Sequence, residues 1–514
     1  MKKTNILFRY LFFIITACLL SCSNDDNIPV TPDPEGPNID FEVKPGMDLV
    51  GIIYDDSGPI SGVVVSDGYT VMTTGDDGIY QMKKNNLAKF VFASIPSEYE
   101  IPTAGSLPVI YQKIDHEQKV NLANFKLKTK TKETEHILVA IADPQPSDFY
   151  EMERFRFETL VDIQAHIDNI AKNTSVYGIV VGDVVWDRLD FYDLYTKHLN
   201  DRLDFPLFQV IGNHDHNQAV IDNDYLASAE FEAAFGPTYY SYNIGDCHYV
   251  VLDDIYYTDR VNYRSYITPE QLIWLKEDLK YVSKDKLIIL GIHIPTKRRA
   301  TNTQLENNQD LYSILEGYNV RIISGHAHHN FTATISSTIE ENTLGAAMGE
   351  FWSGDICGDG SPNGYAIYKI EGNKISDWYY KGTSNDPDYQ IKLYPQNTWN
   401  CAPTEKNIVA VNIFNWHTNW TVSVTEDGIS TPWINPSSTR KYDPLAYDNL
   451  YGEKLPLRHP SGEPIMTDHI FYYTPANTNW NEITVTATTP YGKTYTNKVT
   501  KAGFILMKAF VRPI

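Results

Sequence analysis

Between residues 133 and 388, short apolar runs of strand length alternate with segments of helical pattern. The runs read HILVAIA, YGIVVG, FPLFQVIG, CHYVVLD, KLIILGI and VRIISG, and their nearly continuous apolar character is typical of buried strands. The clearest helical segment is TPEQLIWLKEDLKYV, where Thr268 can be the N-cap, Pro269 the first helical residue and Gln271 the reciprocal capping partner. This alternation predicts a layered α/β domain.

The regions on either side carry strand patterns without helical ones. Residues 46–132 hold short β-branched runs separated by the turn signals DSGP at 56–59 and DDG at 76–78, which favour a small β-sandwich. Over 389–514 the helical signal fades, and we expect a second β-rich module there. Its clearest element is NEITVTATTPYGKTYTNKV, where apolar residues alternate with threonines on both sides of a PYG turn, so we expect a hairpin with one buried face.

The first residues have the pattern of a targeting segment. A positive start (Lys2, Lys3 and Arg9) precedes an apolar run over 11–20, which is shorter than the about 20 residues that a membrane span needs. The run ends in LLSC, which resembles a bacterial lipoprotein cleavage box with Cys22 as the lipidated residue; an ordinary signal peptide with a chance cysteine is the alternative. We therefore expect a signal peptide over 1–21 and a tether rich in Pro and Asp over 22–45.

The proposed anchor also sets the expected location. The stretch SNDDN after Cys22 resembles the acidic tag that sends some lipoproteins to the cell surface. We expect a lipid-anchored protein of the bacterial cell envelope, in the outer membrane, and leave open whether it faces the periplasm or the outside.

Length and charge narrow the class of protein. A chain of 514 residues exceeds one ordinary core, so several domains are expected. The net charge of −22 argues against a partner that is a nucleic-acid polymer, because counterion release needs clustered Lys and Arg. A small anionic substrate is compatible with this charge if a metal supplies local positive charge. Cys247, Cys357 and Cys401 could form one disulfide at most, so no disulfide framework is expected.

Side chains that bind metals follow five of the apolar runs. Strand carboxyl ends at one edge of an α/β sheet converge, so residues distant in sequence can meet there. Such a set offers enough N and O ligands for two divalent cations, with one carboxylate bridging ions about 3.5–4 Å apart. Histidine with carboxylate and no thiolate suits Mn, Fe or Zn. The candidates are Asp143, Gln145, Asp183, Asn213, His214, His293, His326 and His328.

The order of these motifs (D-x-Q, G-D, G-N-H-D, a lone H, G-H-x-H) resembles that of the calcineurin-like metallophosphoesterase superfamily. The flanking β regions, the first of them similar to a prealbumin-like domain, and the segment 349–372 resemble a secreted bacterial subfamily with accessory β domains at both ends. The resemblance implies a fold with a two-layered β-sheet core flanked by helices.

The resemblance also implies a role for each residue. Asp143 and His328 would hold the first metal, and Asp183 would bridge the two. Asn213, His293 and His326 would hold the second metal, and His214 would be a proton donor. Gln145 departs from the usual histidine of the first block, and because an amide oxygen is a weaker donor than imidazole, the identity of the metal is left open.

The expected reaction is metal-dependent hydrolysis of a small phosphoester, with the phosphomonoester favoured. A hydroxide that bridges the two cations would attack phosphorus while His214 protonates the leaving alkoxide. Two alternatives stay open: a phosphodiesterase acting on nucleotides or phospholipid head groups, and a non-catalytic surface lipoprotein whose metal site has decayed. The sequence does not determine the oligomeric state.

Two polar groups near these motifs have two interpretations each. Asp187 is either a carboxylate that orients His214 or an exposed loop residue. Lys297, Arg298 and Arg299 could bind a distal anion of the substrate, although a solvated basic loop is favoured.

The segment SGDICGDGSPNGY is harder to interpret. Asp355 and Asp359 lack the spacing of an EF-hand loop, so a turn near the mouth of a pocket is favoured over a calcium site. Trp352 and Tyr365 either line that mouth or only pack.

Overall fold

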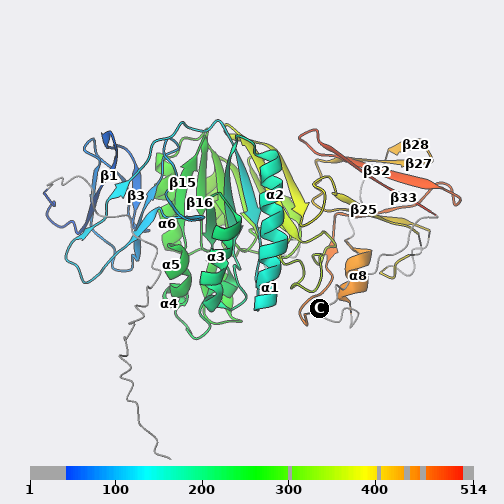
Figure 1. Cartoon of the computed structure of the whole chain (residues 1–514), viewed down its shortest axis with the longest axis horizontal. Coiled ribbons are helices and arrows are strands. Elements are labelled where there is room, and N and C mark those ends of the chain that lie inside the picture. The colour runs from blue at the N-terminus through cyan, green and yellow to red at the C-terminus, as the bar shows by residue number, and fades with distance from the viewer. Residues whose placement is uncertain are drawn as a thin grey trace, which may run out of the picture.

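A computed structural model of the protein describes residues 42–298, 304–396, 398–401, 407–432, 440–451 and 459–501. Three parts lie in a row along the longest axis: a β domain near the N-terminus, a central α/β body and a C-terminal β module (Figure 1). Cys22 and Arg299 lie outside the described residues. Within the described ranges, no helix is long and apolar enough to cross a membrane.

The N-terminal domain is built from two small sheets. The first contains β1 (Leu49–Asp55), β2 (Gly58–Pro59), β5 (Ile79–Met82), β10 (Asn121–Leu122) and β11 (Phe125–Lys126). The second has the order β4-β3-β6-β9, with β3 (Val64–Ser66), β4 (Val71–Thr73), β6 (Phe90–Ser94) and β9 (Tyr111–Lys113). The hairpin β7 (Thr103–Ala104) and β8 (Leu107–Pro108) stands apart from both.

Two larger sheets form the central body. One has the order β14-β13-β12-β23-β24, made of β12 (Glu135–Ile141), β13 (Ser175–Val181), β14 (Leu207–Val210), β23 (Gly364–Glu371) and β24 (Lys374–Gly382). The other has the order β15-β16-β19-β20-β22-β21, made of β15 (Tyr240–Ile244), β16 (Cys247–Val251), β19 (Leu287–Gly291), β20 (Asn319–Ser324), β21 (Phe331–Thr334) and β22 (Ile339–Thr343). Each of the six apolar runs contributes one strand.

The apolar runs are continuous because both faces of each central strand are buried. On β12, Leu138 and Ala140 belong to the core cluster that includes the second sheet, whereas Val139 and Ile141 pack in a separate cluster with the helices. A strand with one face in water would alternate apolar and polar residues instead. The layers are therefore sheet on sheet with helices outside, and the predicted fold class is confirmed.

Helices cover the outer faces of the two sheets (Figure 1). On the side of β12 lie α1 (Phe149–Arg154), a π-helical turn (Phe155–Leu160), α2 (Val161–Ile170), α3 (Tyr192–Arg202) and α5 (Ala229–Phe235). The short helix α4 (Asp224–Ala227) packs through Ala227 in a separate small cluster. The core cluster of the second sheet includes residues of α6 (Pro269–Asp278) and α7 (Asn308–Leu315). Short 3-10 turns span Leu189–Phe191, Asn213–Asp215 and Leu279–Tyr281, and the hairpin β17 (Ile255–Tyr257) and β18 (Tyr263–Ser265) follows β16.

The N-terminus of α6 is capped largely as the sequence predicts. Thr268 accepts a hydrogen bond from the Gln271 amide and Pro269 occupies the first turn, as the sequence predicts. The prediction that the Gln271 side chain bonds back to the N-cap residue Thr268 is wrong. That side chain instead accepts from the Asp253 amide at 2.9 Å and donates to the Asp253 carbonyl at 2.8 Å, because the strand end beside it offers both partners.

The C-terminal module also consists mainly of β strands. Its sheets are β25-β26-β31, with β25 (Ile391–Tyr394), β26 (Val409–Ile413) and β31 (Ile470–Tyr473), and β28-β27-β32-β33, with β27 (Thr421–Glu426), β28 (Ile429–Pro432), β32 (Glu482–Thr488) and β33 (Thr494–Thr500). A short pair, β29 (Lys441–Tyr442) and β30 (Met466–Thr467), and α8 (Pro444–Leu450) complete it. The predicted hairpin is β32–β33, and its face of Ile483, Val485 and Ala487 is fully buried.

The three cysteines of the described ranges, Cys247, Cys357 and Cys401, are all free. The pairing that the sequence left open is therefore not made among them.

Candidate metal centre

The polar side chains that follow the strands meet at one edge of the body, where the carboxyl ends of both sheets come together. Asp143, Asp183 and Asn213 come from the loops after β12, β13 and β14 in the first sheet. His293 follows β19 and His326 follows β20 in the second sheet. The site thus takes groups from both layers.

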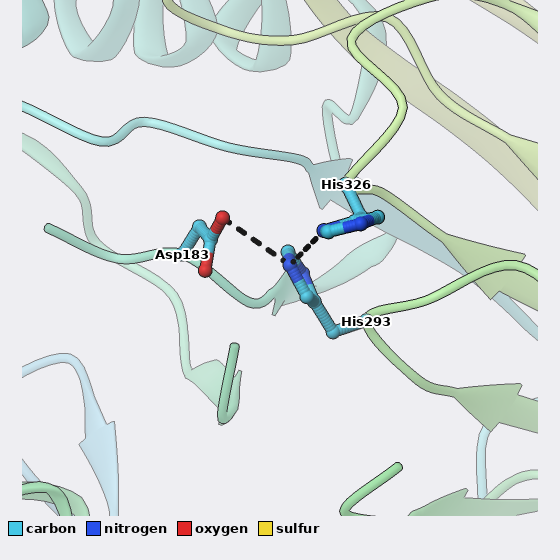
Figure 2. A group of neighbouring side chains, drawn as sticks. All are labelled: Asp183, His293 and His326. Atoms are coloured by element: carbon cyan, nitrogen blue, oxygen red, sulfur yellow. Dashed lines mark hydrogen bonds and ion pairs between the residues drawn. The ribbon is translucent and has the colours of Figure 1, made fainter. Parts of the chain in front are cut away.

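His293 lies at the centre of this group. Its Nε2 is 3.2 Å from Asp183 Oδ2, 3.1 Å from Asn213 Oδ1 and 3.1 Å from His326 Nδ1. Figure 2 shows Asp183 and His326 on either side of the His293 ring. Each of the three titratable residues Asp183, His293 and His326 offers one ligand atom, and these atoms lie within 4.8 Å of one another.

Backbone contacts fix the orientation of His293. Its Nδ1 is 2.9 Å from the carbonyl oxygen of Val181, which can only accept, so Nδ1 carries a proton and Nε2 faces the cluster. On the other side, Asp254 accepts from the amides of His293 and Ile294 at 3.2 and 2.8 Å. The ring is therefore held as a ligand from both sides.

Asp143 organises the second half of the site. Both of its carboxylate oxygens accept from the His326 amide at 2.9 Å, and His328 Nε2 lies 3.8 Å from Oδ1. Gln145 lies alongside, where its Nε2 donates to Asp183 Oδ2 at 3.0 Å. Its Oε1 is buried and has no hydrogen-bond partner.

His214 is held next to Asp183. Its amide donates to Asp183 Oδ1 at 2.9 Å, and its ring Nδ1 is 2.9 Å from Asp187 Oδ1. Asp187 is thus a partner of His214 and not an exposed loop residue, since only 14% of its side chain is exposed. Of the two interpretations that the sequence allowed, this geometry matches the orienting carboxylate.

The loops that carry these groups have unusual backbone conformations. Six candidate residues adopt positive φ values between 45° and 63°: Asp143, Gln145, Asp183, Asp187, His326 and His328. Residues other than glycine rarely adopt this region, and such strain tends to cluster at functional sites. Close packing adds to the constraint, because a Cβ on Gly212 would lie 2.2 Å from the Asp183 amide nitrogen.

Burial and mutual charge shift the pKa values of this group in opposite directions. Burial raises the pKa of Asp143 to about 7, and neighbouring Asp183 adds to the shift. Burial also disfavours the charged form of Asp183, but His293 and His214 outweigh it and lower its pKa below the usual range. Burial opposes protonation of His293, yet Asp183 and Asp143 raise its pKa to about 10. The site therefore strongly favours a positive charge at its centre.

The donor set fits two divalent cations. Carboxylate and amide oxygens together with imidazole nitrogens are ligands of Mn, Fe and Zn. Asp183 lies between the group around His293 and the group around Gln145 and Asp143. Its Oδ2 is close to both His293 and Gln145, while its Oδ1 accepts from the His214 amide. The buried Oε1 of Gln145 is a further oxygen that a cation could satisfy.

Several supporting residues had not been picked out from the sequence. Asp215 accepts from the amides of Gly212 and Val184 at 2.9 and 3.1 Å, and Asp254 holds His293 as described. Both follow apolar strands, so the post-strand rule that found the other candidates could have found them too. Arg298 was one of three loop cations in the sequence analysis, but the structure distinguishes it: its Nε and Nη2 are buried without hydrogen-bond partners.

The segment SGDICGDGSPNGY differs in part from expectation. Asp359 lies in a turn, as expected, but it is fully buried and not at a pocket mouth, and its Oδ2 lies 3.0 Å from His469 Nε2 of the C-terminal module. Trp352 and Tyr365 are 6% and 0% exposed, so they pack. Asp355 does remain at the surface, where it pairs with Arg154 at 2.9 Å.

Two family models match the chain outside the metal-binding motifs. One describes the N-terminal part of calcineurin-like phosphoesterases and matches residues 47–130. The other describes their C-terminal part and matches residues 341–495. No curated protein matches the chain.

Solved structures resemble parts of the chain at low identity. A dimetal phosphatase from Danio rerio is 17% identical over 48% of this chain and 96% of its own, with a TM-score of 0.35. A purple acid phosphatase from yellow lupin seeds is 13% identical over 48% of this chain and 54% of its own, with a TM-score of 0.35. A 5′-nucleotidase from Candida albicans is 15% identical over 51% of this chain and 54% of its own, with a TM-score of 0.32.

The two family models lie on either side of the region that carries the ordered motifs from Asp143 to His328. The chain belongs to the calcineurin-like metallophosphoesterase superfamily and is a phosphoester hydrolase, and its cluster of Asp183, His293 and His326 could hold a metal ion.

Proposed function

We propose that the chain hydrolyses small phosphomonoesters at the site described above. In this proposal Asp143, Gln145 and His328 bind one metal ion, Asp183 binds both, and Asn213, His293 and His326 bind the other. The observation that supports it best is the convergence of three ligand atoms on His293 Nε2, all at 3.1–3.2 Å. The bound metal ions would polarise the phosphoryl group and supply hydroxide near neutral pH.

His214 would protonate the leaving alkoxide. Its Nδ1–H is donated to Asp187, so the ring nitrogen free for the substrate is Nε2, which can give up a proton only from the imidazolium form. Burial opposes that form, but Asp183 and Asp187 raise the pKa of His214 above its ordinary value. The neighbouring carboxylates thus favour the charged form of His214, which a general acid requires.

Arg298 favours a monoester over a diester. Burial lowers the pKa of Arg298 while Tyr263 and Asp143 oppose that shift, and after burial its charge is the next cause of the lowered pKa of His326, so the guanidinium lies near the metal centre. A monoester carries one more negative charge than a diester near neutral pH. A buried guanidinium with two unpaired N–H groups offers a partner for that charge.

The test is a paired assay of the full-length protein in detergent, with a chromogenic phosphomonoester and its diester analogue. Mn²⁺, Zn²⁺ or Mg²⁺ is added to metal-stripped protein, with a chelated sample and an Asp183→Asn variant as controls. We expect metal-dependent turnover that prefers the monoester and is lost in the variant. A diester preference would reject the monoester proposal, and metal-independent turnover would reject the site.

We also propose that the chain is anchored in the outer membrane through a lipid on Cys22. The support is the sequence alone: the positive start, the short apolar run and LLSC. Metabolic labelling with a fatty acid, compared between wild type and Cys22→Ala, tests this. Label on the wild type only is expected, and equal labelling would reject Cys22 as the anchor.

A further inference from the structure

Three rings from distant segments gather beside His214. The ring centroid of Trp186 lies 4.7 Å from His214, 5.0 Å from Phe351 and 5.0 Å from His459. Phe351 and His459 are 4.8 Å apart, and Phe351 is also 5.0 Å from His328. We call Trp186, Phe351 and His459 the ring cluster. It extends from the proposed proton donor to a proposed metal ligand.

The backbone around Phe351 is strained to place it there. Phe351 and Trp352 both have φ values of 53°, a conformation that bulky residues rarely adopt. Trp352 secures the turn, since its Nε1 donates to the Pro144 carbonyl at 3.0 Å and its own carbonyl accepts from Arg154 at 2.9 Å. Strain of this kind persists only where the surrounding structure enforces it, and it is concentrated at functional sites.

His459 reaches the cluster from the C-terminal module. Its amide donates to Ser353 Oγ at 2.7 Å, which ties it to the same turn as Phe351. All three rings are only partly buried, so part of their surface remains accessible to a ligand. By contrast, the rings of Tyr365 and Tyr380 are 0% exposed and closed to any ligand.

The position of the cluster indicates which part of a substrate it would contact. Under the function proposed above, His214 protonates the leaving alkoxide, so the alcohol part of the ester lies on the side of His214. Burial lowers the pKa of His459, which keeps that ring uncharged near neutral pH. The surface offered to the alcohol is therefore aromatic and uncharged, and such surfaces stack flat unsaturated rings.

We propose that the ring cluster is a leaving-group subsite for phosphoesters whose alcohol carries a flat aromatic or heteroaromatic ring, and that the C-terminal module completes it with His459. This inference rests on the proposed role of His214. It makes the C-terminal module part of the substrate site, in addition to its packing role.

Two substrates that share one leaving alkoxide test the subsite. Adenosine 5′-monophosphate and ribose 5-phosphate both release a primary 5′ alkoxide, and the base distinguishes them. We expect kcat/KM to be at least about tenfold higher for the nucleotide, mainly through KM, since a base stacked on aromatic side chains changes affinity by roughly ten- to hundredfold. The substrate ratio cancels any indirect effect on His214.

The variants are His459→Ala and Trp186→Leu, and the matched control is His417→Ala, a partly buried histidine of the same module that has no ring contact with the cluster. We expect the two variants to reduce the preference to about twofold or less and the control to keep it. The proposal of a subsite would be overturned if the wild type did not prefer the nucleotide over ribose 5-phosphate, or if the two variants kept that preference.

Calorimetric binding of the same two compounds to Mn²⁺-loaded protein separates this inference from the proposed function. If neither compound is turned over, the phosphomonoesterase proposal fails for them. A tighter binding of the nucleotide that disappears in His459→Ala would still support the subsite, and equal binding of both compounds would reject it.

Discussion

The Nδ1 of His214 and the Oδ1 of Asp187 lie 2.9 Å apart, and Arg260 approaches the other carboxylate oxygen at 3.0 Å. That second contact is an ion pair without hydrogen-bond geometry, since Asp187 Oδ2 has no hydrogen-bond partner. Asp187 therefore has one strong directional partner, and this is the ring it orients.

Asp187→Asn should reduce kcat by roughly 10- to 100-fold, the usual effect of losing a carboxylate that orients a functional histidine. Because Asp187 raises the pKa of His214, its removal lowers that pKa. The protonated donor then disappears at lower pH, so the alkaline limb of the kcat profile should move to lower pH. Asp190→Asn, which removes an exposed partner of Arg188, is the control and should leave the profile in place. An unshifted limb in Asp187→Asn would contradict the orienting role.

Gln145→His should change which metal the site prefers. An imidazole in place of the amide adds a softer and stronger donor, so affinity for Zn²⁺ should rise relative to Mg²⁺ by roughly tenfold or more. The positive φ of 45° at this position is one that histidine tolerates better than most residues. Competition with a chelating dye measures the change. Gln145→Ala should weaken both metals, and an unchanged preference in Gln145→His would remove residue 145 from the ligand set.

The buried pair of Asp359 and His469 should join the C-terminal module to the metal-binding loop. Asp359 Oδ2 also accepts from the Asn330 amide at 2.9 Å, two residues after His328. His469→Ala leaves a fully buried carboxylate without this hydrogen-bond partner, so the free energy of unfolding should fall by about 1–3 kcal/mol. Urea denaturation measures this loss. Asp355→Asn, at an exposed ion pair, should cost less than about 1 kcal/mol, and equal effects would contradict the assignment.

Glu350→Gln should stabilise the protein above neutral pH. Burial raises the pKa of Glu350 to about 8, whereas an unfolded chain releases this proton near its ordinary value of about 4.3. The contribution of Glu350 to the free energy of unfolding is therefore fully present below about pH 4, and it is lost as the pH rises towards 8. The variant should match the wild-type melting temperature near pH 4 and exceed it by a few degrees at pH 8, in metal-free buffer. Glu306→Gln at an exposed ion pair should show no such trend, and a constant difference at all pH values would contradict the shifted pKa.

The sequence predicted best those site residues that come directly after a strand. Asp143, Asp183 and His293 were found because apolar runs end just before them and strand ends converge. The partner of Asp187 could not be decided from spacing alone, since His214 lies in a different loop. Asp254 also follows an apolar strand but was not picked out, and its role in holding the His293 amide is seen only in the folded structure.

Irregular segments were predicted least well. Asp359 lies in the expected turn, but its burial was not foreseen, because its hydrogen-bond partner His469 lies 110 residues further along the chain. Trp186, Phe351 and His459 belong to no periodic pattern, and only folding brings them together. The positive φ values of the site loops had no sequence signal either, because the residues there are not glycines.

The pairing of β12 has a consequence for the growing chain. β12 lies between β13 and β23, so the sheet that positions Asp143 is completed by residues 364–371. A ribosome must therefore synthesise more than two hundred further residues before the strand that carries Asp143 has both neighbours. All the candidate ligands up to His328 are therefore synthesised before the strand that precedes Asp143 has both of its neighbours.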